Sequence, residues 1–268
     1  MARLMRASRK GLPMLRSTEQ LHGFTALATD GETGRVEAFL FDTATWLVRY
    51  LVARTGSLLM GRLVLITPGA LGAIDSVGRT LAVALTCAQV EHAPEVDAER
   101  PDAPPQGIGL ARYYGQSAMW GAPGVYSAGT YPEALGGAAP SPMEEPLPPA
   151  DTEAGAPGLR NTRLAVHTHV SALDGELGHV ADFVVDDAAW VIRYVVVDTG
   201  TWRPGRQALI APEWIRNAGW SGGSVPVDLA CAAVRQGPEY DPSRALSRED
   251  EEALYRHHGR RGYWEGMS

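Results

Sequence analysis

The chain has 268 residues, of which 45% are hydrophobic, so it can bury two modest cores and we expect one to two globular domains. Its net charge of -7 at pH 7 argues against nucleic acid as the main partner, because phosphate binding depends on basic patches. No run of about 18 apolar residues and no signal-peptide pattern is present, and two cysteines are too few for a disulfide framework, so we expect a cytoplasmic protein.

Residues 1–16 form a basic tail in which Arg3, Arg6, Arg9 and Lys10 alternate with apolar residues. A segment of this kind can lie on an anionic membrane surface or bind an acidic partner. The tail therefore predicts a peripheral contact with the cytoplasmic face of the inner membrane. A frayed terminus is the alternative.

Residues 17–98 read as a series of short strands. An apolar strand is predicted at 36–41 and a turn at 42–45, and the β-branched and aromatic segment 45–55 predicts a central strand. Further strands are predicted at 62–68, which a proline ends, and at 80–86, after which Thr86 should be the N-cap of a short helix. This number of short strands indicates a small closed or nearly closed β-barrel, because closure removes exposed edges.

Residues 99–159 are rich in Pro, Gly and Ala and predict a linker. Residues 160–244 then repeat the first unit, because a shift of 144 residues places Asp30 on Asp174 and Trp46 on Trp190 without a gap. A period this long indicates two homologous domains. The matching strands are predicted at 180–185, 189–199, 206–212 and 224–230, with Asp228 as the N-cap of the helix that follows.

Residues 245–268 are predicted to hold a short amphipathic helix, since Ser247 and Asp250 have the spacing of a capping box. The expected fold is therefore mainly β, with two tandem small β-barrels, short helical segments and a Pro/Gly-rich linker.

The acids of the two repeated D-G-E runs are candidate site residues: Asp30, Glu32, Asp174 and Glu176. Paired carboxylates shift one another's pKa values when they are close, so these acids could form a proton-conducting or cation-binding edge. Ordinary turn chemistry is the alternative, because Asp bonds its own loop and Gly tolerates positive φ.

Arg49 and Arg193 interrupt strands that are otherwise apolar, and an unpaired buried guanidinium is costly. Each arginine is expected to pair with an internal carboxylate, such as Glu32 or Asp42 in the first copy, or to lie at an interface. Trp46 and Trp190 repeat an aromatic position and are candidate structural or interface residues.

The histidines at 167, 169 and 179 could converge on a metal such as zinc, since His167 and His169 would share a strand face. Their counterparts in the first copy are not metal ligands, so the repeat does not depend on such a site. Cys87 and Cys231 are expected to be small buried residues. Nucleophile, phosphate-binding and dinucleotide motifs are absent from the sequence, so we expect no enzyme and no cofactor.

Together these motifs resemble the PRC-barrel family. The resemblance rests on the D-G-E-x-G run, a strand that ends in Asp, the W-x-x-R-Y segment with the T-G after it, and G-R-x-x-L-I-x-P, all present in both copies. The family includes the cytoplasmic domain of the photosynthetic reaction centre H subunit, which covers the quinone side of the membrane-embedded subunits, and a domain of a ribosome maturation factor. The chain departs from the H subunit in lacking its N-terminal transmembrane helix.

The resemblance implies a non-enzymatic docking or assembly subunit with protein partners, for which membrane-embedded reaction-centre subunits are one candidate. Two alternatives stay open: a stand-alone soluble stress or housekeeping protein that self-associates, and a ribosome-maturation-type adaptor.

Overall fold

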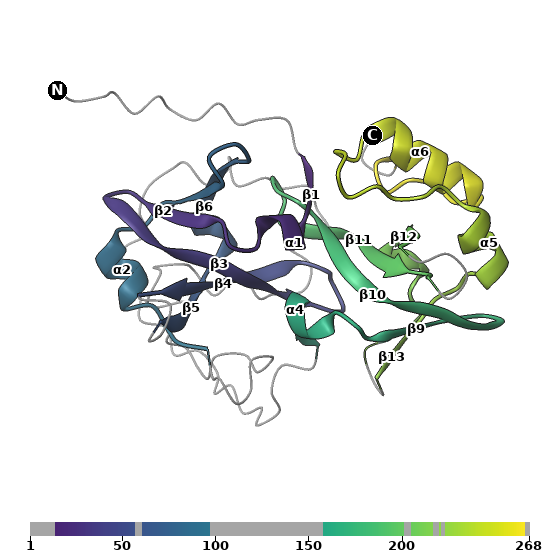
Figure 1. Cartoon of the computed structure of the whole chain (residues 1–268), viewed down its shortest axis with the longest axis horizontal. Coiled ribbons are helices and arrows are strands. Elements are labelled where there is room, and N and C mark those ends of the chain that lie inside the picture. Colours follow the sequence, from purple (N-terminus) through teal and green to yellow (C-terminus); the bar gives the residue numbers. More distant parts are fainter. Residues whose placement is uncertain are drawn as a thin grey trace, which may run out of the picture.

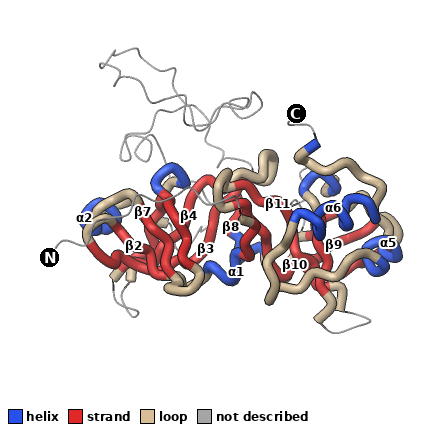
Figure 2. Tube along the Cα trace, turned by 90° about the horizontal axis from the view of Figure 1, so that it is seen from above, coloured by secondary structure: helices blue, strands red, loops and turns tan. Residues whose placement is uncertain are grey.

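The computed structural model describes residues 14–56, 61–96, 158–200, 205–216, 220 and 223–265, and this part of the chain is mainly β (Figure 1). Its strands form two sheets, called sheet 1 and sheet 2 below after the repeat that supplies most of their strands. The two sheets lie side by side along the long axis of the molecule (Figures 1 and 2). The described residues contain no helix long and apolar enough to cross a membrane.

Sheet 1 has the strand order β5-β4-β3-β2-β7-β6, with antiparallel neighbours except for the parallel pair β2 and β7. Its elements are β2 (Thr25–Ala28), β3 (Gly31–Asp42), β4 (Val48–Thr55), β5 (Arg62–Ile66), β6 (Leu71–Asp75) and β7 (Thr80–Val83). The 3-10 helix η1 (Pro68–Ala70) follows β5, and α2 (Cys87–Glu91) lies at the outer end (Figure 1).

Sheet 2 has the order β12-β11-β10-β9-β13, which repeats the same pattern, including the parallel pair of β9 and β13. Its elements are β9 (His169–Ala172), β10 (Gly175–Asp186), β11 (Val191–Asp198), β12 (Gln207–Ile210) and β13 (Ser224–Pro226). The 3-10 helix η4 (Pro212–Trp214), α5 (Cys231–Gln236) and α6 (Arg248–His257) complete this half, and α6 lies beside sheet 2 (Figure 1).

The first segment of each repeat crosses to the other repeat. β1 (Leu15–Ser17) pairs with β10 of sheet 2, and β8 (Leu159–Asn161) pairs with β3 of sheet 1, as Figure 2 shows for β8. The short helices α1 (Thr18–Leu21) and α4 (Thr162–Ala165) follow these strands. Because the two crossings are related by the repeat period, the chain has an internal twofold pseudosymmetry with reciprocally exchanged N-terminal segments.

The core is continuous across the two repeats, so the expectation of two separate cores is wrong. Phe39 stacks on Trp190 with ring centroids 5.6 Å apart, and Phe41 meets Phe183 at 5.2 Å. One cluster of buried apolar residues includes side chains from both sheets. The exchanged segments bring the sheets so close that apolar side chains from both repeats exclude water together.

Two details of the predicted strands differ from the structure. The central strands begin at Val48 and Val191, so Trp46 and Trp190 lie in the preceding turns, where their φ angles are 60° and 52°. Within the described residues, the first and last strands of each sheet do not pair with each other, so the fold that the structure shows is mainly β with two sheets.

The helix caps follow the sequence closely in two of three cases. Ser247 forms the expected capping box with Asp250, and Thr86 is the expected N-cap and also forms a capping box, with Gln89. Asp228 is not the N-cap of α5, since the helix begins after Ala230, which has no capping side chain.

Candidate docking surface at the repeat boundary

The tryptophan turns of the two repeats meet at the pseudo-twofold centre. The Ile192 N–H donates to the Trp46 carbonyl at 2.9 Å, and the Val48 N–H donates to the Trp190 carbonyl at 2.8 Å. A single antiparallel bridge between Leu47 and Val191 lies between these bonds. The left-handed backbone at each tryptophan aims its carbonyl at the other repeat, which gives a physical reason for a conformation that bulky residues rarely adopt.

Arg49 and Arg193 pair with the aspartates that end the preceding strands. The Arg49 Nη2 lies 2.9 Å from the Asp42 Oδ2, and the Arg193 Nη2 lies 3.2 Å from the Asp186 Oδ2. Asp42 is thus a partner of Arg49, whereas Glu32 is exposed and lies at the opposite end of β3. Both arginines are about one-quarter exposed, so their strands are not buried on both faces at this point.

The same aspartates organise the turns. The Asp42 Oδ1 accepts the N–H groups of Ala44 and Thr45 at 2.9 and 3.0 Å, and Asp186 does the same in the second repeat. The pKa of Asp42 is lowered overall: burial raises it, and the bonds from Arg49 and the turn amides outweigh burial.

A groove of about 500 Å³ runs along the repeat boundary on the side of Arg193. It combines the first tryptophan turn, the start of β11, η4 and the C-terminal tail. Its lining residues are Thr43, Ala44, Thr45, Trp46, Val191, Ile192, Arg193, Pro212, Glu213, Ile215 and Tyr263. The volume is in the range of ligand and peptide sites, and the lining combines apolar and polar side chains.

Two charged side chains, Arg193 and Glu213, line this groove and differ in their partners. Arg193 is paired with Asp186, and its guanidinium also lies 4.2 Å from the ring centre of Tyr263. Glu213 accepts a hydrogen bond from the Tyr255 hydroxyl at 2.6 Å, and no cation of the described residues lies within ion-pair distance of it. Glu213 is therefore an exposed carboxylate of the groove that no cation of the described residues neutralises.

A buried carboxylate fixes the tail that forms one wall of the groove. Glu251 of α6 is 2% exposed and accepts the hydroxyls of Tyr194 at 2.7 Å and Tyr263 at 2.9 Å. Its second oxygen lies 2.8 Å from the Arg248 Nη1, and Arg248 stacks on Trp264. Since every oxygen of Glu251 has a partner, the network can hold the tail in one position.

Burial and Glu251 raise the pKa of both tyrosines in this network. The pKa of Tyr263 is raised to about 12, first by burial and then by the nearby carboxylate, and the pKa of Tyr194 is raised further for the same reasons. Both hydroxyls therefore stay protonated near neutral pH and remain hydrogen-bond donors.

The acids of the D-G-E runs lie far from the groove and serve local structure. The Asp30 Oδ1 accepts the Cys87 N–H at 2.7 Å, and Asp174 accepts the Cys231 N–H at the same distance. These bonds lower the pKa of both aspartates. Each aspartate therefore satisfies the first turn of a helix 57 residues further along, in addition to the local turn that the sequence suggests.

The remaining sequence candidates do not converge. His167 and His179 have ring centroids 5.6 Å apart, His169 bonds Glu176, and the described residues contain no group of three metal-ligating side chains. Cys87 and Cys231 are free thiols at matched positions, and Cys87 is less buried than expected. Arg3, Arg6, Arg9 and Lys10 lie outside the described residues.

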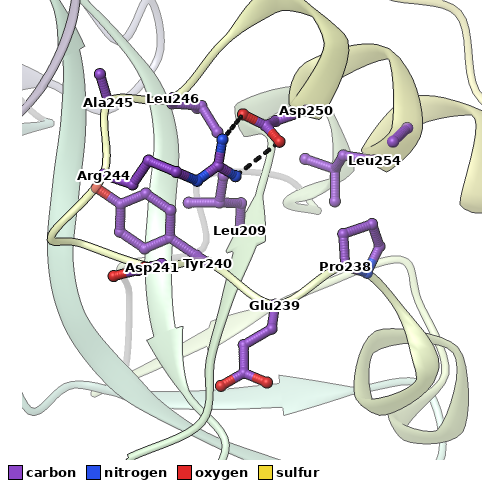
Figure 3. Close-up of a pocket in the computed structure, with 11 residues that line it drawn as sticks. Leu209, Pro238, Glu239, Tyr240, Asp241, Arg244, Ala245, Leu246, Asp250 and Leu254 are labelled. Atoms are coloured by element: carbon purple, nitrogen blue, oxygen red, sulfur yellow. Dashed lines mark hydrogen bonds and ion pairs between the residues drawn. The ribbon is translucent and has the colours of Figure 1, made fainter.

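A second cavity, of about 60 Å³, lies between α6 and β12 (Figure 3). Arg244 binds both carboxylate oxygens of Asp250 at its rim, at 2.9 and 2.8 Å. This space is too small for a ligand of more than a few atoms.

No protein-family model matches the chain, and no curated protein matches it. The sequence indicated Arg193 and Trp46 as candidates but missed Glu213, Ile215 and Tyr263. The sequence does distinguish these three positions, because the two repeats differ there. Their counterparts in the first repeat are Gly69, Leu71 and Met119.

Proposed function

We propose that this chain is a non-enzymatic docking or assembly subunit that binds a protein partner in the repeat-boundary groove. The groove carries the proposal, since both repeats and the C-terminal tail contribute to its lining. Its mixture of apolar and polar side chains favours a protein segment, and Glu213, which no cation of the described residues neutralises, favours a segment with a lysine or arginine side chain.

The sheets are, in this proposal, PRC-type barrels comparable to the cytoplasmic domain of the reaction-centre H subunit. The W-x-x-R-Y segments support the comparison, because their tryptophans lie at the repeat boundary and their arginines pair with the preceding strand ends. The basic residues of the N-terminal tail are proposed as a separate contact with an anionic membrane surface.

The test compares two matched substitutions in pull-downs from membranes and soluble extract of the native cell. Ile215→Arg places a cation in the groove, whereas Leu164→Arg places the same side chain on α4, where Leu164 is 55% exposed. A partner retained by the wild type and Leu164→Arg but lost by Ile215→Arg supports the proposal. Recovery of the free chain alone, or equal binding by both variants, contradicts it.

A charge reversal tests the chemistry of the partner. Glu213→Lys should weaken binding more than Glu239→Lys, because Glu239 lies on the second cavity and away from the groove. Binding that resists Glu213→Lys while Ile215→Arg abolishes it would restrict the partner to an apolar segment without a basic residue.

A further inference from the structure

We infer that the two repeats are a complementary pair that recognise each other without the linker, so that the chain is a covalently joined heterodimer. The interface that carries this inference consists of the exchanged segments 14–22 and 158–166 and the surfaces that receive them. The inference is independent of the proposed partner in the groove.

The backbone of each exchanged segment completes the other repeat. Leu15, Arg16 and Ser17 are in register with Asp186, Val185 and Val184, and the equivalent β8 residues are in register with β3. The pairing extends beyond the strands, since the Asp187 N–H donates to the Met14 carbonyl at 3.1 Å and the Thr43 N–H donates to the Gly158 carbonyl at 2.7 Å. Removal of either segment would expose the backbone of a sheet edge.

Apolar side chains fill the space between the β1–β10 pair and the β8–β3 pair. Leu21 of α1 and Ala165 of α4 are buried in the continuous core. Phe41 meets Phe183 and also Trp220, whose ring centroid is 5.7 Å away. Buried aromatic residues of this kind are the usual energetic centre of protein–protein interfaces.

The contacts of the first segment depend on residues that only the second repeat has. The Asp182 carboxylate accepts bonds from the Ser17 and Thr18 hydroxyls and from the Glu19 N–H. Ala38 is the residue at this position of the first repeat, where the Thr162 hydroxyl instead bonds the Phe39 N–H at 3.1 Å. A pairing of two first repeats would therefore leave the Ser17–Thr18 segment without its carboxylate.

One arginine adds to the preference for unlike repeats. The Arg16 Nε lies 2.6 Å from the Asp187 Oδ2, and both side chains are largely buried. Thr43 replaces Asp187 in the first repeat, so Arg16 would lose its ion pair if two first repeats paired. Arg160, the counterpart of Arg16, bonds the Trp220 carbonyl at 2.9 Å, which is a contact within the second repeat and does not distinguish like from unlike pairs. The unlike pair is therefore preferred, because two first repeats would lack the carboxylates that bind Arg16, Ser17 and Thr18.

The experiment cuts the linker of the otherwise complete chain. A site-specific protease sequence is inserted after residue 128, the folded protein is cleaved, and native mass spectrometry and light scattering record the species present. The inference predicts one particle that contains one copy of each fragment. It also predicts that the melting temperature becomes dependent on protein concentration after cleavage, since association then contributes to stability.

Two variants test whether the fragments stay together through the contacts of this interface or only because their exchanged segments are entangled. In the cleavable chain, Arg16→Ala combined with Asp182→Ala should raise the dissociation constant of the fragments by about tenfold or more. Val77→Ala, at a site that is 97% exposed, should leave the constant unchanged. Two separately folded fragments, precipitation of one fragment, or pairs of like fragments after cleavage would each overturn the inference.

Discussion

The buried carboxylate of Asp182 offers a direct test of how the exchanged segment is held, through the substitution Asp182→Ala. Its Oδ1 accepts the Thr18 hydroxyl at 2.7 Å, the Glu19 N–H at 3.1 Å and the Phe183 N–H at 2.7 Å, and its Oδ2 accepts the Ser17 hydroxyl. The first repeat has alanine at the same place and shows what the variant can adopt.

The cost of the substitution follows from this comparison. In the variant, the Thr18 hydroxyl can accept the Phe183 N–H, as the Thr162 hydroxyl accepts the Phe39 N–H in the first repeat. Ser17 still accepts the Gln20 N–H, so the Glu19 N–H is the backbone donor that loses its partner. One unsatisfied donor lowers the free energy of unfolding by about 1–3 kcal/mol.

The pH dependence has a definite sign. Burial raises the pKa of the Asp182 carboxyl above its unfolded value, and the four hydrogen bonds offset this in part. The native state therefore binds a proton more tightly than the unfolded state, and the stabilisation present below the unfolded pKa is lost as pH rises through the folded pKa. For each unit by which folding raises the pKa of Asp182, the destabilisation caused by Asp182→Ala is about 1.4 kcal/mol smaller at a pH above the folded pKa than at low pH.

Urea unfolding of wild type and Asp182→Ala at pH 4 and pH 8 measures both quantities. The destabilisation should be larger at pH 4 than at pH 8. Asp30→Ala is the control of opposite sign, because hydrogen bonds to Cys87 lower the pKa of Asp30 and its contribution is lost as pH falls. A destabilisation by Asp182→Ala that is equal at both pH values, or larger at pH 8, would refute the reasoning.

Three further substitutions test the tail, the arginine pair and a close backbone approach. Glu251→Ala leaves the Tyr194 and Tyr263 hydroxyls without their acceptor. At about 1–3 kcal/mol for each hydroxyl, the free energy of unfolding should fall by about 2–6 kcal/mol in a denaturant titration; a change under about 1 kcal/mol would contradict this role. Arg193→Ala should cost about 0.5–1 kcal/mol less in a Tyr263→Leu background than in the wild type, because the Arg193 guanidinium stacks on that ring; equal costs in the two backgrounds would exclude that contribution. Gly178→Ala should lower the melting temperature strongly, and more than Gly175→Ala does. A Cβ at position 178 would lie 2.0 Å from a backbone oxygen, whereas a Cβ at position 175 would meet open space. Similar melting temperatures would show that the strand can shift.

Much of the local structure was predictable because it depends on neighbours in the chain. The 144-residue period, the strand-rich composition and the turn residues at Asp42 and Asp186 predicted two equivalent, mainly β units. The capping boxes at Thr86 and Ser247 were also predictable, since each requires only a polar side chain and a partner three residues on. The assignment of Asp228 as a cap was wrong, because the true partner of that helix start is Asp174, distant in sequence.

The order of the amino acids is enough to show that the chain consists of two similar β-rich repeats, whereas only the folded molecule shows that they exchange their first segments. Strands as short as β1 and β8 have no hydrophobic period of their own, so their pairing depends on which sheet edge is open to them. The continuous core, the burial of Asp182 and the groove all follow from that exchange. Each of them joins residues far apart in the chain, and such contacts form only where the folded surfaces fit and exclude water.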